Sequence, residues 1–98
     1  MLANCEFMLS LLCHVSTEFE KGNATIGQIA RAKANCSRLG REVVALAREV
    51  CGGNGIILDN HVMKQFMDME AIHTYEGTYD INSLVSGREL TGGLAAFK

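Results

Sequence analysis

Residues 73–82 have the sequence HTYEGTYDIN and separate two segments whose apolar residues recur at the spacing of a helix. Gly77 lets the backbone bend tightly or approach a ligand closely. The hydroxyl of Thr78 is placed to accept a hydrogen bond from the first turn of the following segment, as a helix N-cap does. We therefore expect two helices joined by a corner from which the Glu76 carboxylate projects. A carboxylate presented in this way can act as a base toward a bound molecule.

Motifs on both sides of this corner carry a resemblance to a known family. Residues 75–78, YEGT, followed by Ile81, are similar to the catalytic-base motif of the acyl-CoA dehydrogenases. Residues 70–78, EAIHTYEGT, and residues 87–92, GRELTG, most resemble the branch that contains the glutaryl-CoA dehydrogenases and the short-chain acyl-CoA oxidases. Residues 52–55, GGNG, lie upstream where the family has its GGNG loop, so the resemblance extends over most of the chain.

The resemblance implies a reaction and the residues that perform it. Glu76 would remove the α-proton of a short-chain acyl-CoA thioester while the β-hydride passes to FAD. The backbone N–H of Glu76 would polarise the thioester carbonyl, and Gly77 would leave room for the substrate. Thr78 and Asp80, next to the base, would face the flavin, and Phe97 in the C-terminal tail would also contact FAD. The GGNG loop and the residues just before it would contact the FAD of a neighbouring subunit: Glu49, Val50, Cys51, Gly52 and Gly53. No metal is implied.

The rest of the chain divides into helices by its apolar periodicity. We expect two long antiparallel helices over residues 2–21 and 25–51, and two shorter helices packed on them over residues 61–72 and 79–91. The chain has no proline, and its ten glycines cluster at the expected helix ends and in the GGNG loop. With the resemblance, this predicts an all-α fold, the C-terminal part of an up-down helical bundle of the acyl-CoA dehydrogenase type.

Local signals mark the expected helix ends. Gly22 is placed to close the first helix as a left-handed C-terminal residue. Thr25 and Gln28 have the spacing of a capping box at the start of the second helix. Asp59 or Asn60 is expected to cap the third helix. These signals predict where helices begin and end, and they say nothing about how the helices pack.

The first helix is apolar on more than one face, which is typical of a helix buried between several neighbours. A chain of 98 residues offers few neighbours, so we expect either self-association or a further bundle helix. Its length allows one domain. Taken with the resemblance, residues 1–98 would form a partial C-terminal bundle domain, with the N-terminal helical and middle β domains lying outside this chain. We expect the chain alone to be inactive.

Composition limits the partners of the chain. A net charge of −2 argues against a nucleic-acid or anionic-membrane partner. No apolar run approaches the roughly 20 residues of a membrane-spanning helix. The four cysteines lack a C-x-x-C pair or zinc-finger spacing, so we expect them to be small buried apolar residues in a reducing compartment.

Other functions remain open at this stage. The parent enzyme can be a peroxisomal-type short-chain acyl-CoA oxidase that uses the same base, and Tyr79 favours this, since glutaryl-CoA dehydrogenases are expected to have histidine there. The chain can also be a non-catalytic oligomerisation fragment. The resemblance implies an acyl-CoA substrate, a homotetramer, and electron-transfer flavoprotein or oxygen as electron acceptor. The expected location is intracellular, in the mitochondrial matrix or alternatively the peroxisome.

Overall fold

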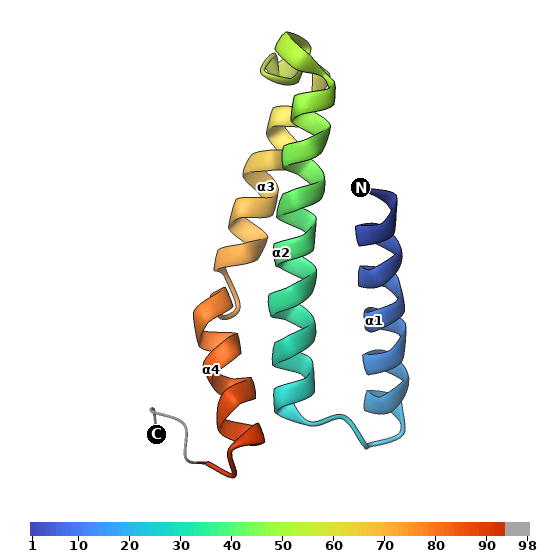
Figure 1. Ribbon diagram of the computed structural model, residues 1–98, viewed down its shortest axis with the longest axis vertical. Coiled ribbons are helices and arrows are strands. Elements are labelled where there is room, and N and C mark those ends of the chain that lie inside the picture. Colours follow the sequence, from blue (N-terminus) through green and yellow to red (C-terminus); the bar gives the residue numbers. More distant parts are fainter. Residues whose placement is uncertain (94–98) are drawn as a thin grey trace.

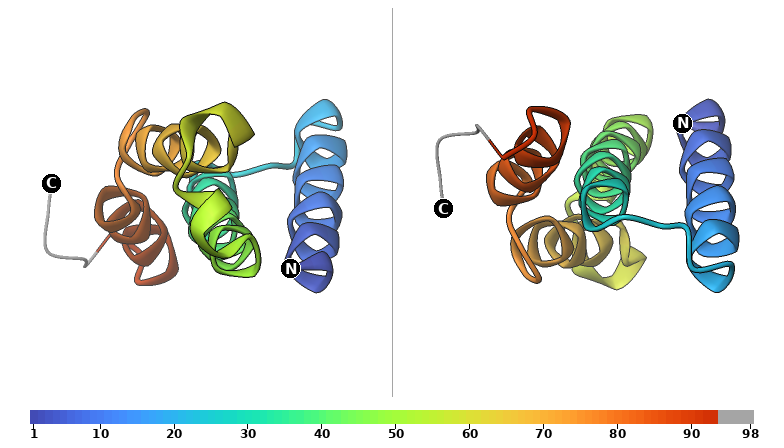
Figure 2. Two further views of the ribbon diagram at one scale, coloured as in Figure 1. Left: turned by 90° about the horizontal axis from the view of Figure 1, so that it is seen from above. Right: turned by 90° about the horizontal axis from the view of Figure 1, so that it is seen from below.

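Helix α2 (Ile26–Val50) lies at the centre of the molecule, and the other helices pack along it (Figure 1). The computed structural model describes residues 1–93, and all regular structure in this part of the chain is helical. Helix α1 (Leu2–Glu20) runs antiparallel to α2 on one side. Helices α3 (Val62–Thr74) and α4 (Tyr79–Leu90) follow one another along the opposite side (Figure 2). The predicted all-α fold is therefore confirmed.

Two short 3-10 helices connect α2 to α3 at one end of the molecule. They are η1 (Gly52–Gly55) and η2 (Leu58–Asn60). Helices α3 and α4 pack mainly against α2, and α2 is also the main neighbour of α1. The extents of the molecule along its principal axes are 49 × 28 × 18 Å.

The chain between α1 and α2 follows its local capping signals. The N–H groups of Gly22 and Asn23 donate to the carbonyls of Phe19 and Glu18, at 3.0 and 2.8 Å, and Gly22 has a φ of 75°. This pair of bonds is the Schellman motif, which needs a left-handed residue. The Thr25 hydroxyl then accepts from the Gln28 N–H at 3.1 Å, and the Gln28 side chain accepts from the Thr25 N–H at 3.0 Å. Both predicted helix ends are confirmed.

Helix α2 meets its neighbours through small residues. Ala30, Ala34 and Ser37 are buried on α2, and Asn82 and Ser86 are buried on α4. Small side chains let two helix backbones approach closely, which brings polar groups of one helix within hydrogen-bonding distance of the other. The buried residues of α2 are small throughout the helix: Gly27, Ala30, Ala32, Ala34, Ser37 and Gly40.

Helix α1 has only α2 as a substantial neighbour, and none of its residues is buried. Phe7 and Phe19 are 64 % and 67 % exposed. An apolar groove of about 640 Å³ lies between α1 and α2. Its lining is Leu12, Val15, Ser16, Phe19, Glu20, Ile29, Ala32, Lys33 and Cys36. The exposure of α1 agrees with the expectation that this helix needs a further partner.

The cysteines differ from their prediction. All four are free, but Cys5, Cys13 and Cys51 are exposed and Cys36 is only half-buried. Two of the exposed thiols lie on α1, which has too few neighbours to bury them, and the third lies at the exposed end of α2. Burial raises the pKa of the Cys36 thiol. Within residues 1–93, no helix is long and apolar enough to span a membrane.

Candidate active site

The corner between α3 and α4 consists of residues 75–78, and two of them have left-handed backbone conformations. Tyr75 closes α3, and its N–H donates to the Ala71 carbonyl at 2.9 Å. Glu76 has a φ of 52° and Gly77 a φ of 90°. The Thr78 hydroxyl accepts from the Ile81 N–H at 3.2 Å, so Thr78 is the N-cap of α4 as predicted. The chain thus bends between two consecutive helices and carries Glu76 at the bend.

Glu76 is exposed at this bend. Within residues 1–93 its carboxylate has no hydrogen-bond or ion-pair partner. A positive φ is uncommon for a residue with a side chain and costs roughly 1–2 kcal/mol. Such conformations persist where the surrounding structure enforces them, and they concentrate at functional sites. The corner therefore presents one unpaired carboxylate in an enforced conformation.

Gly77 is required at the corner for two reasons. Its φ of 90° is a conformation that glycine adopts readily. In addition, a Cβ atom at this position would lie 2.9 Å from Nδ2 of Asn82. The Asn82 amide occupies that space because it donates to the Gly77 carbonyl at 2.8 Å.

Helix α2 contacts the corner through Lys33 and Ser37. Nζ of Lys33 donates to the Gly77 carbonyl at 2.6 Å and to the His73 carbonyl at 3.2 Å. The Ser37 hydroxyl lies 3.0 Å from Nδ1 of His73. The His73 ring in turn stacks on Tyr79, with ring centroids 5.9 Å apart. No sequence pattern marks Lys33 or Ser37 as a contact of the corner, because their partners lie 36 to 44 residues away along the chain.

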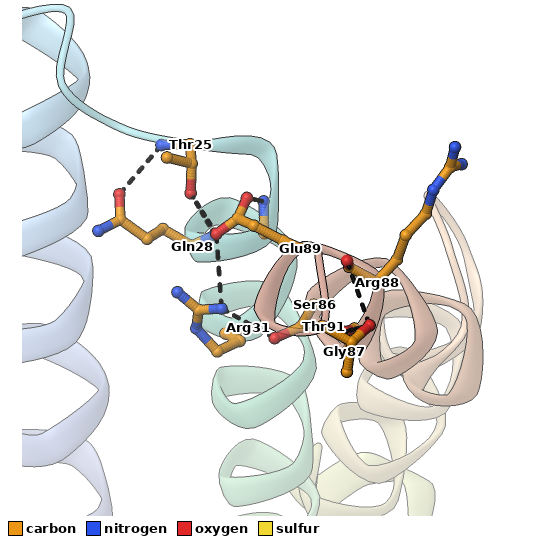
Figure 3. A network of polar contacts seen from close by, with 9 residues as sticks. Thr25, Gln28, Arg31, Ser86, Gly87, Arg88, Glu89 and Thr91 are labelled. Atoms are coloured by element: carbon orange, nitrogen blue, oxygen red, sulfur yellow. Dashed lines mark hydrogen bonds and ion pairs between the residues drawn. The ribbon is translucent and has the colours of Figure 1, made fainter. Parts of the chain in front are cut away.

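A second cluster holds the far end of α4 against the start of α2 (Figure 3). The Glu89 carboxylate accepts from the Thr25 hydroxyl and from the Gly27 N–H, each at 2.8 Å. Arg31 donates to the Ser86 hydroxyl at 2.9 Å and lies 3.8 Å from Glu89. The Thr25 hydroxyl bond, then the Gly27 N–H and the Arg31 charge, lower the pKa of the Glu89 carboxyl. Helix α4 is thereby fixed at both ends, by Glu89 at one and by the Asn82 amide at the other.

The GGNG loop lies at the opposite end of α2 from this cluster, in the structure η1. Gly52 follows the end of α2 with a φ of 56°, and a Cβ at Gly52 or Gly53 would meet no atom of residues 1–93 within 4 Å. A Cβ at Gly55 would instead lie 2.5 Å from the Arg48 carbonyl oxygen. The backbone of Gly52 and Gly53 is therefore open to an approaching ligand, as a cofactor-contacting loop requires, whereas Gly55 is needed for packing.

The start of α3 differs from its prediction. Neither Asp59 nor Asn60 caps the helix, because α3 begins after His61, which has a φ of 62° and makes no side-chain capping bond. The Asn60 amide instead donates to the Asn54 carbonyl at 2.9 Å and so joins the two 3-10 helices. Asn60 therefore connects two turns that lie six residues apart and does not cap α3.

The structure places the predicted site residues in two groups. Glu76, Gly77 and Thr78 lie in the corner and Asp80 lies in the first turn of α4; Figure 1 shows this corner between α3 and α4. Glu49, Val50, Cys51, Gly52 and Gly53 lie at the end of α2, where all five are exposed. Because Lys33 contacts the corner and a helix rises about 1.5 Å per residue, the groups are about 27 Å apart along α2. Phe97 lies outside the described residues. Within residues 1–93, no three metal-ligating side chains are grouped to hold a metal ion.

Comparison with known proteins agrees with this geometry. Residues 1–91 match the family model described as acyl-CoA dehydrogenase, C-terminal domain, and the chain belongs to this family. The structure also matches the crystal structure of glutaryl-CoA dehydrogenase from Mycobacterium smegmatis, with a TM-score of 0.85 and 32 % sequence identity. The match covers 92 % of this chain and 23 % of the mycobacterial chain. The chain therefore spans less than a quarter of the length of the enzyme that it matches.

Proposed function

We propose that this chain supplies the catalytic base of an FAD-dependent acyl-CoA dehydrogenase that oxidises a short-chain acyl-CoA between its α and β carbons. The observation that carries the proposal is Glu76, an exposed carboxylate without a partner in residues 1–93, on a corner whose backbone is fixed from two helices. The likeness to glutaryl-CoA dehydrogenase supports the substrate class.

Each residue of the corner has a separate role in the proposed reaction. Glu76 takes the α-proton as a general base. Its backbone N–H donates to the thioester carbonyl and stabilises the negative charge that develops there. Gly77 would contact the substrate through its backbone, because the space of its missing side chain is filled by the Asn82 amide. FAD, when bound, accepts the β-hydride and completes the two-electron oxidation. Thr78 and Asp80 lie on the side of the corner that would face this cofactor.

The remaining parts of the site belong to regions outside these residues. A ligand pocket encloses most of its ligand, and one corner and one loop do not form such an enclosure. We propose that an N-terminal helical domain and a middle β domain complete the enzyme, as the coverage of only 23 % of the matched chain suggests. Residues 1–98 alone would then neither retain FAD nor oxidise acyl-CoA. Purification of these residues as a yellow protein with stoichiometric FAD would contradict this.

The second group of site residues supports self-association. A loop about 27 Å from the base along α2 is poorly placed to contact a cofactor at the same corner. It is better placed to contact the FAD of a neighbouring subunit, in a homotetramer of the complete enzyme. The exposed apolar residues of α1, such as Phe7 and Phe19, would also favour association. Sedimentation of the chain at micromolar concentration should show oligomers, and a stable compact monomer would contradict the proposal.

An acyl-CoA oxidase with the same base is a second candidate, favoured by Tyr79. This residue stacks on His73 beside the base and stands where glutaryl-CoA dehydrogenases are expected to have histidine. The two candidates differ in the electron acceptor, which is electron-transfer flavoprotein for a dehydrogenase and oxygen for an oxidase. Oxygen consumption by the complete enzyme during acyl-CoA turnover separates them.

The test of the base is Glu76→Gln in the complete enzyme. The substitution keeps the size of the side chain and removes the basic oxygen, so folding and FAD content should be unchanged. The rate of flavin reduction by a short acyl-CoA should fall by about 10²–10⁴-fold or more, the usual effect of removing a general base. Binding of the thioester should change little, because the backbone N–H is unaltered.

The matched control is Glu70→Gln. Glu70 lies on α3 close to the corner, but it pairs with Arg41 at 2.7 Å and has no proposed role in the reaction. An exposed ion pair contributes about 0–1 kcal/mol, so this variant should keep its rate of flavin reduction. The proposal fails if Glu76→Gln reduces its flavin at a near wild-type rate, or if Glu70→Gln is the variant that stops the reaction.

A further inference from the structure

We propose that Lys33 is a positioning residue for the base: its ammonium group on α2 holds the segment of backbone that carries Glu76. This inference rests on the proposed function of Glu76. It adds a residue that lies 43 positions before the base and that carries no recognisable motif.

The two contacts of Lys33 lie on either side of Glu76 in the chain. Nζ donates to the His73 carbonyl at 3.2 Å and to the Gly77 carbonyl at 2.6 Å. One ammonium group therefore joins the last turn of α3 to the residue that follows the base. Glu76 lies within the loop that this bridge closes, so the bridge limits how far its backbone can move.

The Gly77 carbonyl is the central acceptor of the corner. It accepts from Lys33 on α2 and from the Asn82 amide on α4, the latter at 2.8 Å. Two donors from different helices fix the orientation of the peptide between Gly77 and Thr78. Because glycine is the most flexible residue, this peptide would otherwise rotate easily and carry the left-handed Glu76 with it.

The charge of Lys33 strengthens this arrangement. Hydrogen bonds from a charged donor are roughly twice as strong as those between neutral groups. The His73 carbonyl belongs to the last turn of α3, where a positive charge is favourable because the helix dipole is negative at that end. Both contacts of the ammonium are to backbone oxygens, which is the pattern of a group that holds the chain in place.

Helix α2 is well packed around Lys33 and can therefore support this contact. The residues on either side of Lys33, Ala32 and Ala34, are both buried, and Lys33 itself is half-buried. One turn further along, Ser37 is buried and bonds to the His73 ring at 3.0 Å. Two successive turns of α2, through Lys33 and Ser37, therefore hold the corner and the end of α3 in place. Loss of the Lys33 contact alone should loosen the corner without unfolding the bundle.

The experiment uses the complete enzyme with Lys33→Met, which keeps the length of the side chain and removes its donors. Flavin reduction by a short acyl-CoA should slow by roughly 10- to 100-fold, because a misplacement of about 1 Å can cost 10²-fold. Lys33→Arg, which restores a charged donor, should recover most of the rate. The control Lys64→Met removes an exposed lysine that pairs with Asp68 on α3, and it should keep the wild-type rate.

Two further readouts separate positioning from a general loss of structure. Hydrogen–deuterium exchange of the peptide spanning residues 73–83 should speed up in Lys33→Met and not in Lys64→Met, while FAD content stays unchanged. In the Glu76→Gln background, Lys33→Met should cause no further loss of rate, because a residue that acts through the base has no effect when the base is absent.

The outcomes distinguish this inference from the proposed function. Slow flavin reduction with unchanged exchange of residues 73–83, or an equal additional loss in the Glu76→Gln background, would overturn the positioning role. Faster exchange in Lys33→Met, together with a fully active Glu76→Gln enzyme, would support the Lys33 contact and overturn the assignment of the base. Loss of FAD and helicity in both Lys33→Met and Lys33→Arg would show that Lys33 holds the fold as a whole, and would also overturn the inference.

Discussion

The corner at residues 75–78 and the loop at residues 51–55 both contain a left-handed glycine after a helix, but the surrounding structure treats them differently. At the corner, the Asn82 amide packs directly against Gly77, and the Gly77 carbonyl accepts hydrogen bonds from Lys33 on α2 and Asn82 on α4. In the loop, Gly52 and Gly53 have open space where a side chain would be. A held turn suits a group that must be placed accurately, whereas an open turn leaves the backbone free to meet a ligand.

The largest effect on stability should come from Gly77→Ala. The alanine backbone would be held in the left-handed conformation of Gly77, and its Cβ would displace the Asn82 amide from the carbonyl of residue 77. We expect a loss of roughly 2–4 kcal/mol in the free energy of unfolding, from backbone strain and a lost hydrogen bond. Urea unfolding followed by circular dichroism measures it. A change below about 0.5 kcal/mol, the range of neutral surface substitutions, would show that the corner is not held as described.

A smaller effect is expected inside the loop, where Gly55→Ala and Gly53→Ala form a matched pair. A Cβ at Gly55 would meet the Arg48 carbonyl oxygen at 2.5 Å, so this variant should lose about 1–3 kcal/mol. Gly53→Ala should stay within about 0.5 kcal/mol, because its Cβ would have no atom of residues 1–93 within 4 Å. The same unfolding measurement compares the two, and equal losses would contradict the division of the loop into a packed and an open part.

In the complete enzyme, Gly53→Ala also tests whether the loop contacts FAD. If the open backbone of the loop meets the FAD of a neighbouring subunit, a methyl group there should reduce the FAD retained after dialysis while the melting of the helices is unchanged. The control is Gly87→Ala on α4, where a Cβ also meets no atom of the described part of the chain within 4 Å. Equal FAD retention by both variants would contradict the proposal that the loop contacts FAD.

The smallest effect concerns pH and the Glu89 contact that holds α4. The bonds from Thr25 and Gly27 lower the pKa of the Glu89 carboxyl in the folded chain. A depressed folded pKa contributes stability that is present above the unfolded pKa and is lost as the pH falls through the folded pKa. Melting temperature should therefore fall on acidification below the ordinary carboxyl range. Glu89→Gln should show a shallower fall than wild type, and an unchanged pH profile in that variant would contradict the role of Glu89.

The sequence predicted structural features correctly where the interacting residues lie within a few positions of each other in the chain. The predicted helix ends at Gly22, Thr25 and Thr78 are correct, because the bonds that form them join residues a few positions apart. The cap of α3 was predicted wrongly, because Asn60 bonds to the other 3-10 helix instead. The cysteines were expected to be buried, and three are exposed: Cys5 and Cys13 lie on α1, whose one substantial neighbour in residues 1–93 is α2, and Cys51 lies at the exposed end of α2.

By itself, the sequence determined the helices, the family and the position of Glu76, because periodicity, capping and the YEGT motif are properties of short segments. Only the tertiary structure decided which groups hold the corner that carries Glu76. Lys33 and Gly77 are 44 residues apart, and Gly27 and Glu89 are 62 apart. Such pairs meet because small buried residues let α2 and α4 pack closely. That distance depends on the whole interface and cannot be inferred from either segment alone.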